Sequence, residues 1–243
     1  MKKFYENDNF WIGVGADHTF NCLKLMGGDC SLAEVYTYIE SKVLGFDEEE
    51  IVKIKNQNTI MLVDAWIEVR RIILAKVKEM EENGWDYPHC HVSDYKDLYL
   101  ILNKDASVYD LFSDKSEDND VYKAMREMLM KLEGLKTPDE IITEISAFIH
   151  ENYVKGTFGS NTQLFCWFFM QMVLIFNNFG PAVSFPNRYF EMLEMFPISN
   201  LLYGEIMRTK KSEWMECEYF KTLTNFWIVK SKEYHKFIEE NYM

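Results

Sequence analysis

The sequence is poor in proline and in positive charge. Five prolines occur in 243 residues, so few positions force a helix to end. Lys and Arg total 26 against 39 Asp and Glu, which gives a formal net charge of −13. Nucleic-acid backbones and anionic membrane surfaces repel such a chain, so we expect no nucleic-acid partner. The acidic surface is typical of a cytoplasmic protein and would suit a basic protein partner.

The sequence also lacks a regular pattern of paired cysteines, and we expect that its first residues are not a signal peptide. The five cysteines are irregularly spaced and include no Cys-x-x-Cys pair, which indicates reduced thiols in a cytosol. The start, MKKFYENDNFW, leads from two lysines into polar residues, unlike a signal peptide. His89, Cys90 and His91 could offer metal ligands, but three consecutive residues do not converge easily on one ion. We therefore expect no metal site.

The sequence has no hydrophobic run long enough to cross a membrane. The apolar segment Leu164–Phe176 has about 13 residues, whereas a span needs roughly 20. Asn161 and Gln163 precede the segment, and Gln171 interrupts it. We interpret it as a helix that is buried on most sides. Its aromatic residues surround the helix, so most belong to a core, and some could form a homo-oligomer interface.

Helical patterns fill most of the chain. Ser31 and Glu34 form the sequence pattern of a capping box, for a helix that ends at Gly45. A second helix is predicted with the same kind of start and stop, from Thr137, Pro138 and Glu140 to Gly156. Further helices are expected over about 47–84, as one helix or two, over 94–103, 121–135 and 186–196, and in two patterns within 197–243.

Two details of this pattern carry separate expectations. The acidic run Asp47–Glu50 suits the first turn of the 47–84 helix. The stretch over about 104–120 indicates a loop or a short hairpin, because polar residues flank its apolar ones, Val108, Tyr109, Leu111 and Phe112. The chain is therefore predicted to be all-α, with at most a small β-hairpin, and to form a single domain over 1–243.

The order of several segments resembles a known family. A helix ends at Gly156, and the loop TFGSNT, the apolar helix and then NNFGPAVSF follow it. This order resembles the core of the Fic (Fido) family, in which a loop of pattern His-x-Phe-x-Asp/Glu-Gly-Asn-Gly-Arg-x-x-Arg holds nucleotide phosphates. LKLMGGDCSLAEVYTYI, DLYLILN and VYDLF resemble upstream family segments, the last at the place of the target-docking flap. The resemblance implies a Fic-like core over about 22–196, with a short strand in AVSF, and a C-terminal helical extension over 197–243.

The motif loop departs from the family pattern in its chemical residues. In one register Thr157 stands at the catalytic histidine and Phe158 at the aromatic position. The residues in place of Gly-Asn-Gly-Arg are then Gly159, Ser160, Asn161 and Thr162, and the acidic residue is deleted. In a second register His150 is the catalytic histidine and Gly156 lies near the first glycine, but Asn152 replaces the aromatic residue.

Both registers lack the groups that transfer of a nucleoside monophosphate needs. No arginine occurs between Glu127 and Asn187, although the reaction needs cations for charge on the phosphate oxygens. No carboxylate occurs between Glu151 and Glu191 to hold Mg²⁺. The family's inhibitory Ser/Thr-x-x-x-Glu-Gly/Asn is also lost, with Cys22 and Met26-Gly27 in its place. What remains is the set of backbone amides of Gly159–Thr162 at a helix start, which favours anions.

The sequence therefore supports three hypotheses. The first is a Fic-like, non-catalytic regulator or inhibitor, such as one from a phage or mobile element, that binds a protein, a nucleotide with Mg²⁺, or both. The second is a Fic-type enzyme for AMPylation or phosphocholination with a rewired site, and its candidate residues are His150, Thr157, Ser160 and Asn161. The third is an unrelated helical interaction protein. In that case TFGSNT is an ordinary helix cap and His150 a core histidine with satisfied hydrogen bonds.

Overall fold

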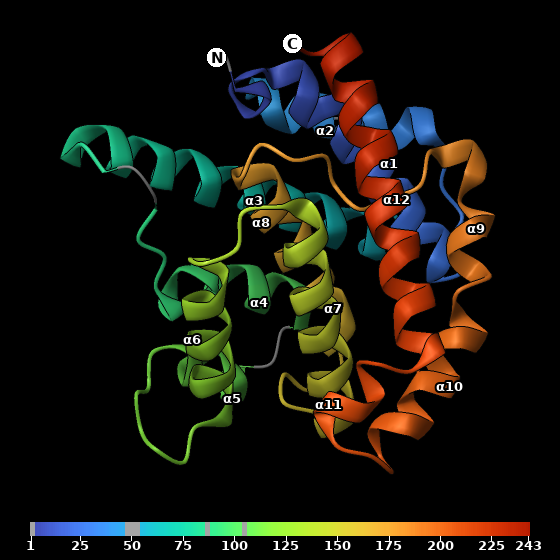
Figure 1. The fold of residues 1–243 in the computed structure, drawn as a ribbon. Coiled ribbons are helices and arrows are strands. Elements are labelled where there is room, and N and C mark those ends of the chain that lie inside the picture. The colour runs from blue at the N-terminus through green and yellow to red at the C-terminus, as the bar shows by residue number, and fades with distance from the viewer. Residues whose placement is uncertain (1–2, 47–53, 86–87, 104–105) are drawn as a thin grey trace.

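Helices are the regular secondary structure found in the part of the chain that the structure describes. The computed structural model describes residues 3–46, 54–85, 88–103 and 106–243, and these ranges contain no strand. The fold is therefore all-α, as predicted. The longer helices are α1 (Asp8–Leu25), α2 (Leu32–Leu44), α3 (Gln57–Asn83), α4 (Lys96–Asn103), α6 (Asp120–Leu132), α7 (Pro138–Lys155), α8 (Thr162–Phe176), α10 (Phe196–Ile206) and α12 (Glu218–Asn241) (Figure 1). Short helices are α5 (Ala106–Tyr109), α9 (Phe190–Leu193) and α11 (Lys211–Trp214).

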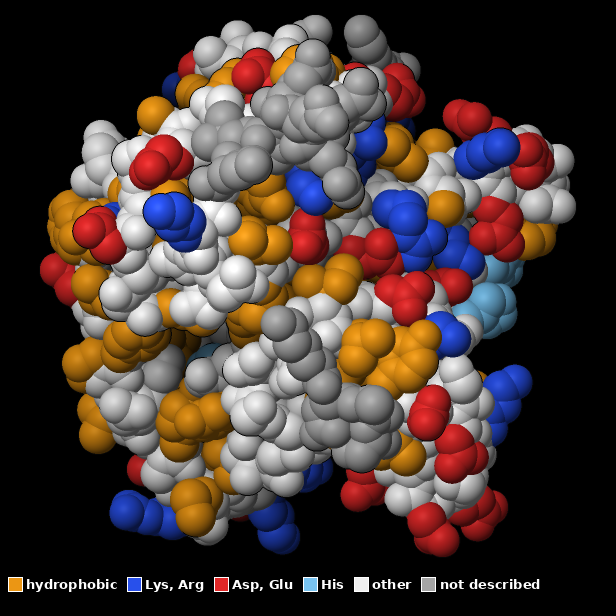
Figure 2. Space-filling view, turned by 180° about the vertical axis from the view of Figure 1, so that it is seen from behind, with side chains coloured by type: hydrophobic (Ala, Val, Ile, Leu, Met, Phe, Trp, Pro, Cys, Tyr) orange, Lys and Arg blue, Asp and Glu red, His pale blue; other side chains and the backbone are white. Residues whose placement is uncertain are grey.

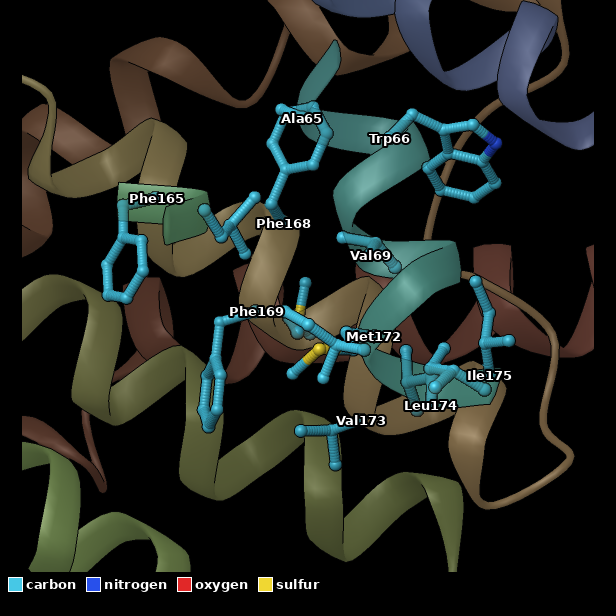
Figure 3. Close-up of a cluster of buried hydrophobic side chains, with 14 of the residues drawn as sticks. Ala65, Trp66, Val69, Phe165, Phe168, Phe169, Met172, Val173, Leu174 and Ile175 are labelled. Carbon is cyan, nitrogen blue, oxygen red and sulfur yellow. The ribbon is translucent and has the colours of Figure 1, made fainter. Parts of the chain in front are cut away.

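Helix α8 forms the centre of the core. Phe165, Phe168 and Phe169 are fully buried, and Figure 3 shows Phe168 on the side of α8 that faces Ala65 and Trp66 of α3. Helices α7, α3 and α4 pack directly against α8. The interpretation of the apolar segment as a buried helix is confirmed. Among the described helices, none combines the length and the apolar character that crossing a bilayer requires.

Local capping chemistry sets the helix ends on both sides of the core. Ser31 and Glu34 form the predicted capping box of α2, and Gly45 ends that helix with a φ of 72°. The second capping box starts α7, which Gly156 ends with a φ of 66°. Glycine adopts this left-handed conformation without steric cost, so the chain can turn sharply after α7. These predictions are confirmed.

A loop or a short hairpin was predicted near Phe112, and the described residues there form no hairpin. Residues 106–112 form α5 and a 3₁₀ turn, Asp110–Phe112, in place of paired strands. Phe112 is fully buried and packs at 5.1 Å from the ring of Tyr99 and at 5.6 Å from that of Phe165. Asn119 donates hydrogen bonds from its side-chain amide to the carbonyl oxygens of Leu111 and Asp114. The turn thus satisfies its backbone locally and needs no partner strand.

Two further expectations about local structure are corrected. The short strand expected in AVSF is absent, since residues 181–185 are irregular. Helix α3 begins at Gln57 and is capped by the Asn56 side chain, which accepts from the amides of Asn58 and Thr59. Its first turn contains no acidic residue. The acidic run Asp47–Glu50 lies outside the described residues.

Helix α12 joins the C-terminal part of the chain to the core. It crosses the front of the molecule in Figure 1, and both chain ends lie at the same end of the structure. The side-chain amide of Asn7 donates to the carbonyl oxygen of Tyr242 at 3.1 Å. Tyr234 and Ile238 of α12 belong to the main hydrophobic core, and the Tyr234 hydroxyl donates to Asp17 at 2.5 Å. Helices α10 and α12 also pack against each other and against α7, where they bound the cavity described next.

Candidate functional site

A cavity of about 480 Å³ lies between α7, α8, α10 and α12. The end of α1 and residues near α9 complete its wall. Figure 2 shows hydrophobic side chains gathered around a hollow on the left of that face, the side of α9 and α10. The volume lies within the range of about 300–1,000 Å³ that is usual for small-molecule sites.

His150 of α7 lines this cavity and is 7% exposed. Neither ring nitrogen has a hydrogen-bond partner among the described residues. Its ring centre lies 5.6 Å from that of Tyr203 on α10. Burial lowers the pKa of His150 to about 4, so the imidazole is neutral at neutral pH. The side chain is therefore a buried polar group with open hydrogen-bonding capacity, unlike a core histidine with satisfied hydrogen bonds.

Phe158 anchors the loop after α7 by packing against aromatic residues of the core. Phe158 is fully buried, and its ring centre lies 5.2 Å from that of Phe165. The Tyr99 hydroxyl donates a 2.7 Å hydrogen bond to the Phe158 carbonyl oxygen. Gly159 follows with a φ of 74°, which turns the chain toward α8. This turn brings Ser160 and Asn161 to the cavity, together with His150.

The loop amides are mostly used within the protein. The Gly159 amide donates to the Gly156 carbonyl oxygen at 3.1 Å, and the Thr162 amide to that of Gly159 at 3.3 Å. The Asn161 amide donates to the side chain of Asn103 at 3.1 Å. Asn161 also donates from its side chain to the Leu102 carbonyl oxygen, so it holds the loop to α4 and leaves α8 without a side-chain cap. Few donors of this loop are left for a phosphate.

The sequence-predicted residues therefore divide into two groups. His150, Ser160 and Asn161 share the cavity. The residues that do not line it are Thr157, Gly156, Gly159 and Thr162. The Thr157 amide donates a hydrogen bond to the Asn152 carbonyl oxygen. Thr162 is buried, and its hydroxyl donates to the Gly159 carbonyl oxygen. The position of the catalytic histidine in the second register, His150, therefore lies at the cavity. The same position in the first register, Thr157, does not.

Aromatic rings form a large part of the cavity wall. The ring centres of Trp167 and Trp227 lie 4.5 Å apart, and those of Tyr153 and Tyr203 lie 4.7 Å apart. The Gln163 side chain donates to the Tyr203 hydroxyl. Burial is the main cause that raises the pKa of Tyr203 well above its usual value, so its hydroxyl stays protonated.

Uncharged polar groups complete the wall. The Ser146 hydroxyl and the indole N–H of Trp167 are buried without a hydrogen-bond partner in the described structure. Cys22 also lines the cavity, and burial raises the pKa of its thiol to about 12, which keeps it protonated and unreactive. Among the described side chains that line this cavity, none is Asp, Glu, Lys or Arg.

The charged groups lie in a separate, smaller groove of about 90 Å³ between α6, α7 and α11. There Glu151 forms ion pairs with Lys155 at 2.7 Å and with Lys211 at 2.6 Å. These charges compensate one another and face away from His150. Within the described ranges, no group of three or more His, Cys, Asp or Glu side chains could hold a metal ion.

Several wall residues were missed by reasoning from the sequence. Helix α10 contributes Phe196, Ser199, Asn200 and Tyr203, and α12 contributes Trp227. The four α10 residues occupy positions i, i+3, i+4 and i+7, so they share one helix face. This spacing of aromatic and small polar residues was a usable signal. Trp227 carries no such signal, because only the packing of α12 brings it to the cavity.

Comparison with known proteins does not identify a relative. No protein-family model, curated protein or solved structure gives a significant match to this chain. The function is therefore inferred from the site and from the sequence pattern around it.

Proposed function

We propose that this chain is a non-catalytic, Fic-like binding protein that acts as a regulator or inhibitor, and that the cavity beside His150 is its ligand site. The observation that carries the proposal is a cavity with open hydrogen-bonding groups and, among the described residues that line it, no charged side chain. Buried polar groups without partners are uncommon in proteins, and at a concave site they are typical of ligand recognition.

The chemistry around His150 supports binding over group transfer. A general base works best when its pKa lies near the working pH, whereas burial holds that of His150 at about 4. Transfer of a nucleoside monophosphate also needs a carboxylate for Mg²⁺ and cations for the phosphate oxygens. The described lining of the cavity offers neither.

The Fic resemblance gains support from which segments meet. Cys22 and Met26, at the positions of the family's inhibitory pattern, line the same cavity as His150 and Ser160. These segments lie more than a hundred residues apart in the sequence. Their meeting is what the resemblance implies, because an inhibitory segment acts on the motif loop. The rival function, a transferase with His150 as base, implies the same meeting of segments, so the experiment below must decide between the two.

The mouth of the cavity offers a surface for a protein partner. Met26, Tyr153 and Phe196 line the cavity and are each more than two-fifths exposed. Phe190 and Leu193 of α9, close to this mouth in sequence, are also exposed. Apolar groups gathered at one place on a surface are typical of interaction sites.

A label-transfer assay separates the two functions. The protein is incubated with Mg²⁺, a mixed protein extract, and ATP or CDP-choline labelled in the group to be transferred. We expect no transfer above the level without the protein. Transfer of label that disappears in a His150→Phe variant would overturn the proposal and establish the transferase.

Thermal unfolding with a panel of nucleotides, nucleosides and other small molecules tests the binding role. A ligand at about 100 times its dissociation constant stabilises by about 2.7 kcal/mol. For this chain length we expect a rise in Tm of roughly 5–10 °C. Ser199→Trp fills the cavity and should abolish the rise, whereas Ser116→Trp, on an exposed loop, should keep it. The proposal fails if no small molecule shifts Tm and no protein partner can be crosslinked at the mouth.

A further inference from the structure

We propose that the ligand of this cavity is an uncharged molecule with a flat heteroaromatic ring and a hydrogen-bonding edge, of the nucleobase or nucleoside class. The inference rests on the proposed function and specifies its ligand. It departs from the expectation of a nucleotide held by its phosphates. Three properties of the wall carry it: the absence of charge, the aromatic rings and the unfilled hydrogen bonds.

The lack of charge argues against a phosphorylated ligand. The described side chains of the wall include no Lys or Arg to balance a phosphate. The amides of Gly159, Asn161 and Thr162 are used inside the protein. Moving an anion from water into a site without a counter-charge costs several kcal/mol. A triphosphate would therefore bind here more weakly than the same molecule without its phosphates.

The aromatic rings favour a flat ligand. Four rings from four different helices border the cavity. They are those of Trp167 (α8), Trp227 (α12), Tyr153 (α7) and Tyr203 (α10). Aromatic rings attract one another in offset-stacked and edge-to-face arrangements, at centroid distances of about 4.5–7 Å. A planar ring can make such contacts with several of these side chains at once. A flexible aliphatic chain would contact them too, but without this preference in orientation.

The unfilled hydrogen bonds favour a ring with polar atoms at its edge. The neutral imidazole of His150 offers one donor and one acceptor, the Ser146 hydroxyl offers both, and the indole of Trp167 donates. All three side chains line the cavity. A buried polar group without a partner costs about 1–3 kcal/mol. A nucleobase edge alternates donors and acceptors, so small rotations of these side chains can pair several of them together.

A purely apolar ligand is disfavoured on the same grounds. A lipid tail or an aliphatic ring would fill the volume but leave His150, Ser146 and Trp167 unpaired. Sites built for hydrogen bonding reject analogues that lack the matching groups by factors of about 10⁴ or more in favourable cases. The wall chemistry thus distinguishes three ligand classes that can be compared in one experiment.

The test measures binding of defined probes to the whole chain by titration calorimetry, with tryptophan fluorescence as a second signal from Trp167 and Trp227. The probes are adenosine, guanosine, cytidine, uridine and their free bases, ATP with Mg²⁺, and octanol. We expect at least one nucleoside or base to bind with a Kd below about 1 mM. The corresponding nucleoside triphosphate should bind at least about tenfold more weakly.

Variants connect the binding to the proposed groups. His150→Phe keeps a ring of similar shape but removes both nitrogens, and it should raise the Kd about tenfold. His235→Phe, on α12 outside the cavity, should leave the Kd unchanged. If His150→Phe does not unfold cooperatively, Ser146→Ala supplies the same test with a smaller change. An unchanged Kd in every folded variant of this pair would contradict the hydrogen-bonding role.

The other outcomes have distinct meanings. Equal or tighter binding of ATP overturns the inference, because it contradicts the cost of an uncompensated anion, and it leaves the proposed binding function in place. Binding of octanol and of no other probe also overturns the inference, because an apolar ligand leaves the polar groups of the wall unpaired, and it too leaves the proposed binding function in place. If no uncharged probe binds up to about 10 mM, the inference is wrong. The label-transfer assay and crosslinking of a protein partner then decide whether the proposed function is kept.

Discussion

The Tyr99 hydroxyl donates a 2.7 Å hydrogen bond to the carbonyl oxygen of Phe158, 59 residues further along the chain. Both residues are fully buried. Tyr99 belongs to α4, and Phe158 belongs to the loop that carries Ser160 and Asn161 to the cavity. Asn161 bonds to the same helix through the Leu102 carbonyl oxygen. Helix α4 therefore holds the loop in place although α4 itself does not line the cavity.

Tyr99→Phe should loosen this loop without changing the cavity wall. The substitution removes the donor and leaves the buried Phe158 carbonyl oxygen unpaired, which costs about 1–2 kcal/mol. We expect that loss in the free energy of unfolding by urea. Hydrogen exchange should also accelerate at the amides of the 157–161 loop, because local opening becomes easier.

Tyr109→Phe is the matched control for this prediction. The Tyr109 hydroxyl donates to Asp97 at 3.2 Å, at an exposed position. Water replaces the lost partner there, so the change in stability should stay below about 0.5 kcal/mol. Equal losses for Tyr99→Phe and Tyr109→Phe would show that the Phe158 bond does not anchor the loop.

Gly15→Ala should strongly destabilise the core. A Cβ atom at this position of α1 would lie 2.2 Å from the indole nitrogen of Trp66. Trp66 is fully buried, and its N–H donates to the Trp11 carbonyl oxygen at 2.8 Å. The indole must shift and lose that bond, so we expect a cost of about 3 kcal/mol. Calorimetry should show a fall in Tm of roughly 6–12 °C.

Gly204→Ala tests whether the effect comes from crowding alone. Gly204 lies within α10, and a Cβ atom there would meet no heavy atom within 4 Å. Alanine has the higher helix propensity, so this variant should gain up to about 1 kcal/mol. A loss at Gly204 comparable to that at Gly15 would contradict the steric explanation.

His18 should make the protein sensitive to acid. The side chain is fully buried between Trp66 and Phe168, and burial lowers its pKa to about 3. The unfolded chain binds the proton near pH 6.5, whereas the folded protein does not until about pH 3. Stability is therefore lost as pH falls from 6.5 toward 3, by about 2 kcal/mol at pH 5. His18→Phe should remove this part of the difference in unfolding free energy between pH 7 and pH 5.

Asp17 should have the opposite effect on the pH dependence of stability, because its pKa is raised in the folded protein. Burial raises the pKa of Asp17 to about 6, although the hydrogen bond from Tyr234 lowers it in part. The folded protein therefore takes up this proton before the unfolded chain does. The resulting stabilisation is complete below about pH 3.9 and is lost as pH rises through 6. Asp17→Asn should make the loss of stability from pH 7 to pH 5 steeper, and a flatter profile would contradict this assignment.

The helices were predictable where local chemistry sets them. The capping boxes at Ser31 and Thr137, and the glycines at 45 and 156, act through neighbouring residues alone. Near Phe112 the sequence was ambiguous, since a short apolar stretch between polar residues fits a hairpin or a helical turn. The packing of Phe112 against Tyr99 and Phe165 selects the turn, and that contact is not visible in the local sequence.

The cavity was only partly predictable. His150, Ser160 and Asn161 were found because they lie around a loop with a recognisable pattern. Tyr203 and Trp227 were not found, since the angle at which α10 and α12 pack on α7 brings them into place. The use of the Asn161 amide inside the protein could not be predicted either, because its acceptor, Asn103, is 58 residues away.

Lys230 should support the cavity through α9. Its side chain is 5% exposed, and its ammonium group lies 2.7 Å from the Glu191 carboxylate and 3.0 Å from that of Glu233. Arg188 pairs with the other oxygen of Glu191 at 2.6 Å. The cluster joins the α9 segment, whose Met192 lines the cavity, to α12. Removing the buried cation leaves two carboxylates close together with less compensation.

Lys230→Ala should therefore cost about 2 kcal/mol in unfolding by urea, less than a fully buried pair because both carboxylates are partly exposed. It should also weaken binding of any cavity ligand, since α9 loses its attachment. Lys236→Ala, whose partner Glu240 lies 3.9 Å away at an exposed position, should change stability by less than about 0.5 kcal/mol. If Lys230→Ala lowers stability but leaves ligand affinity intact, α9 does not shape the site. If both variants behave alike, burial of the Lys230 cation has no energetic role.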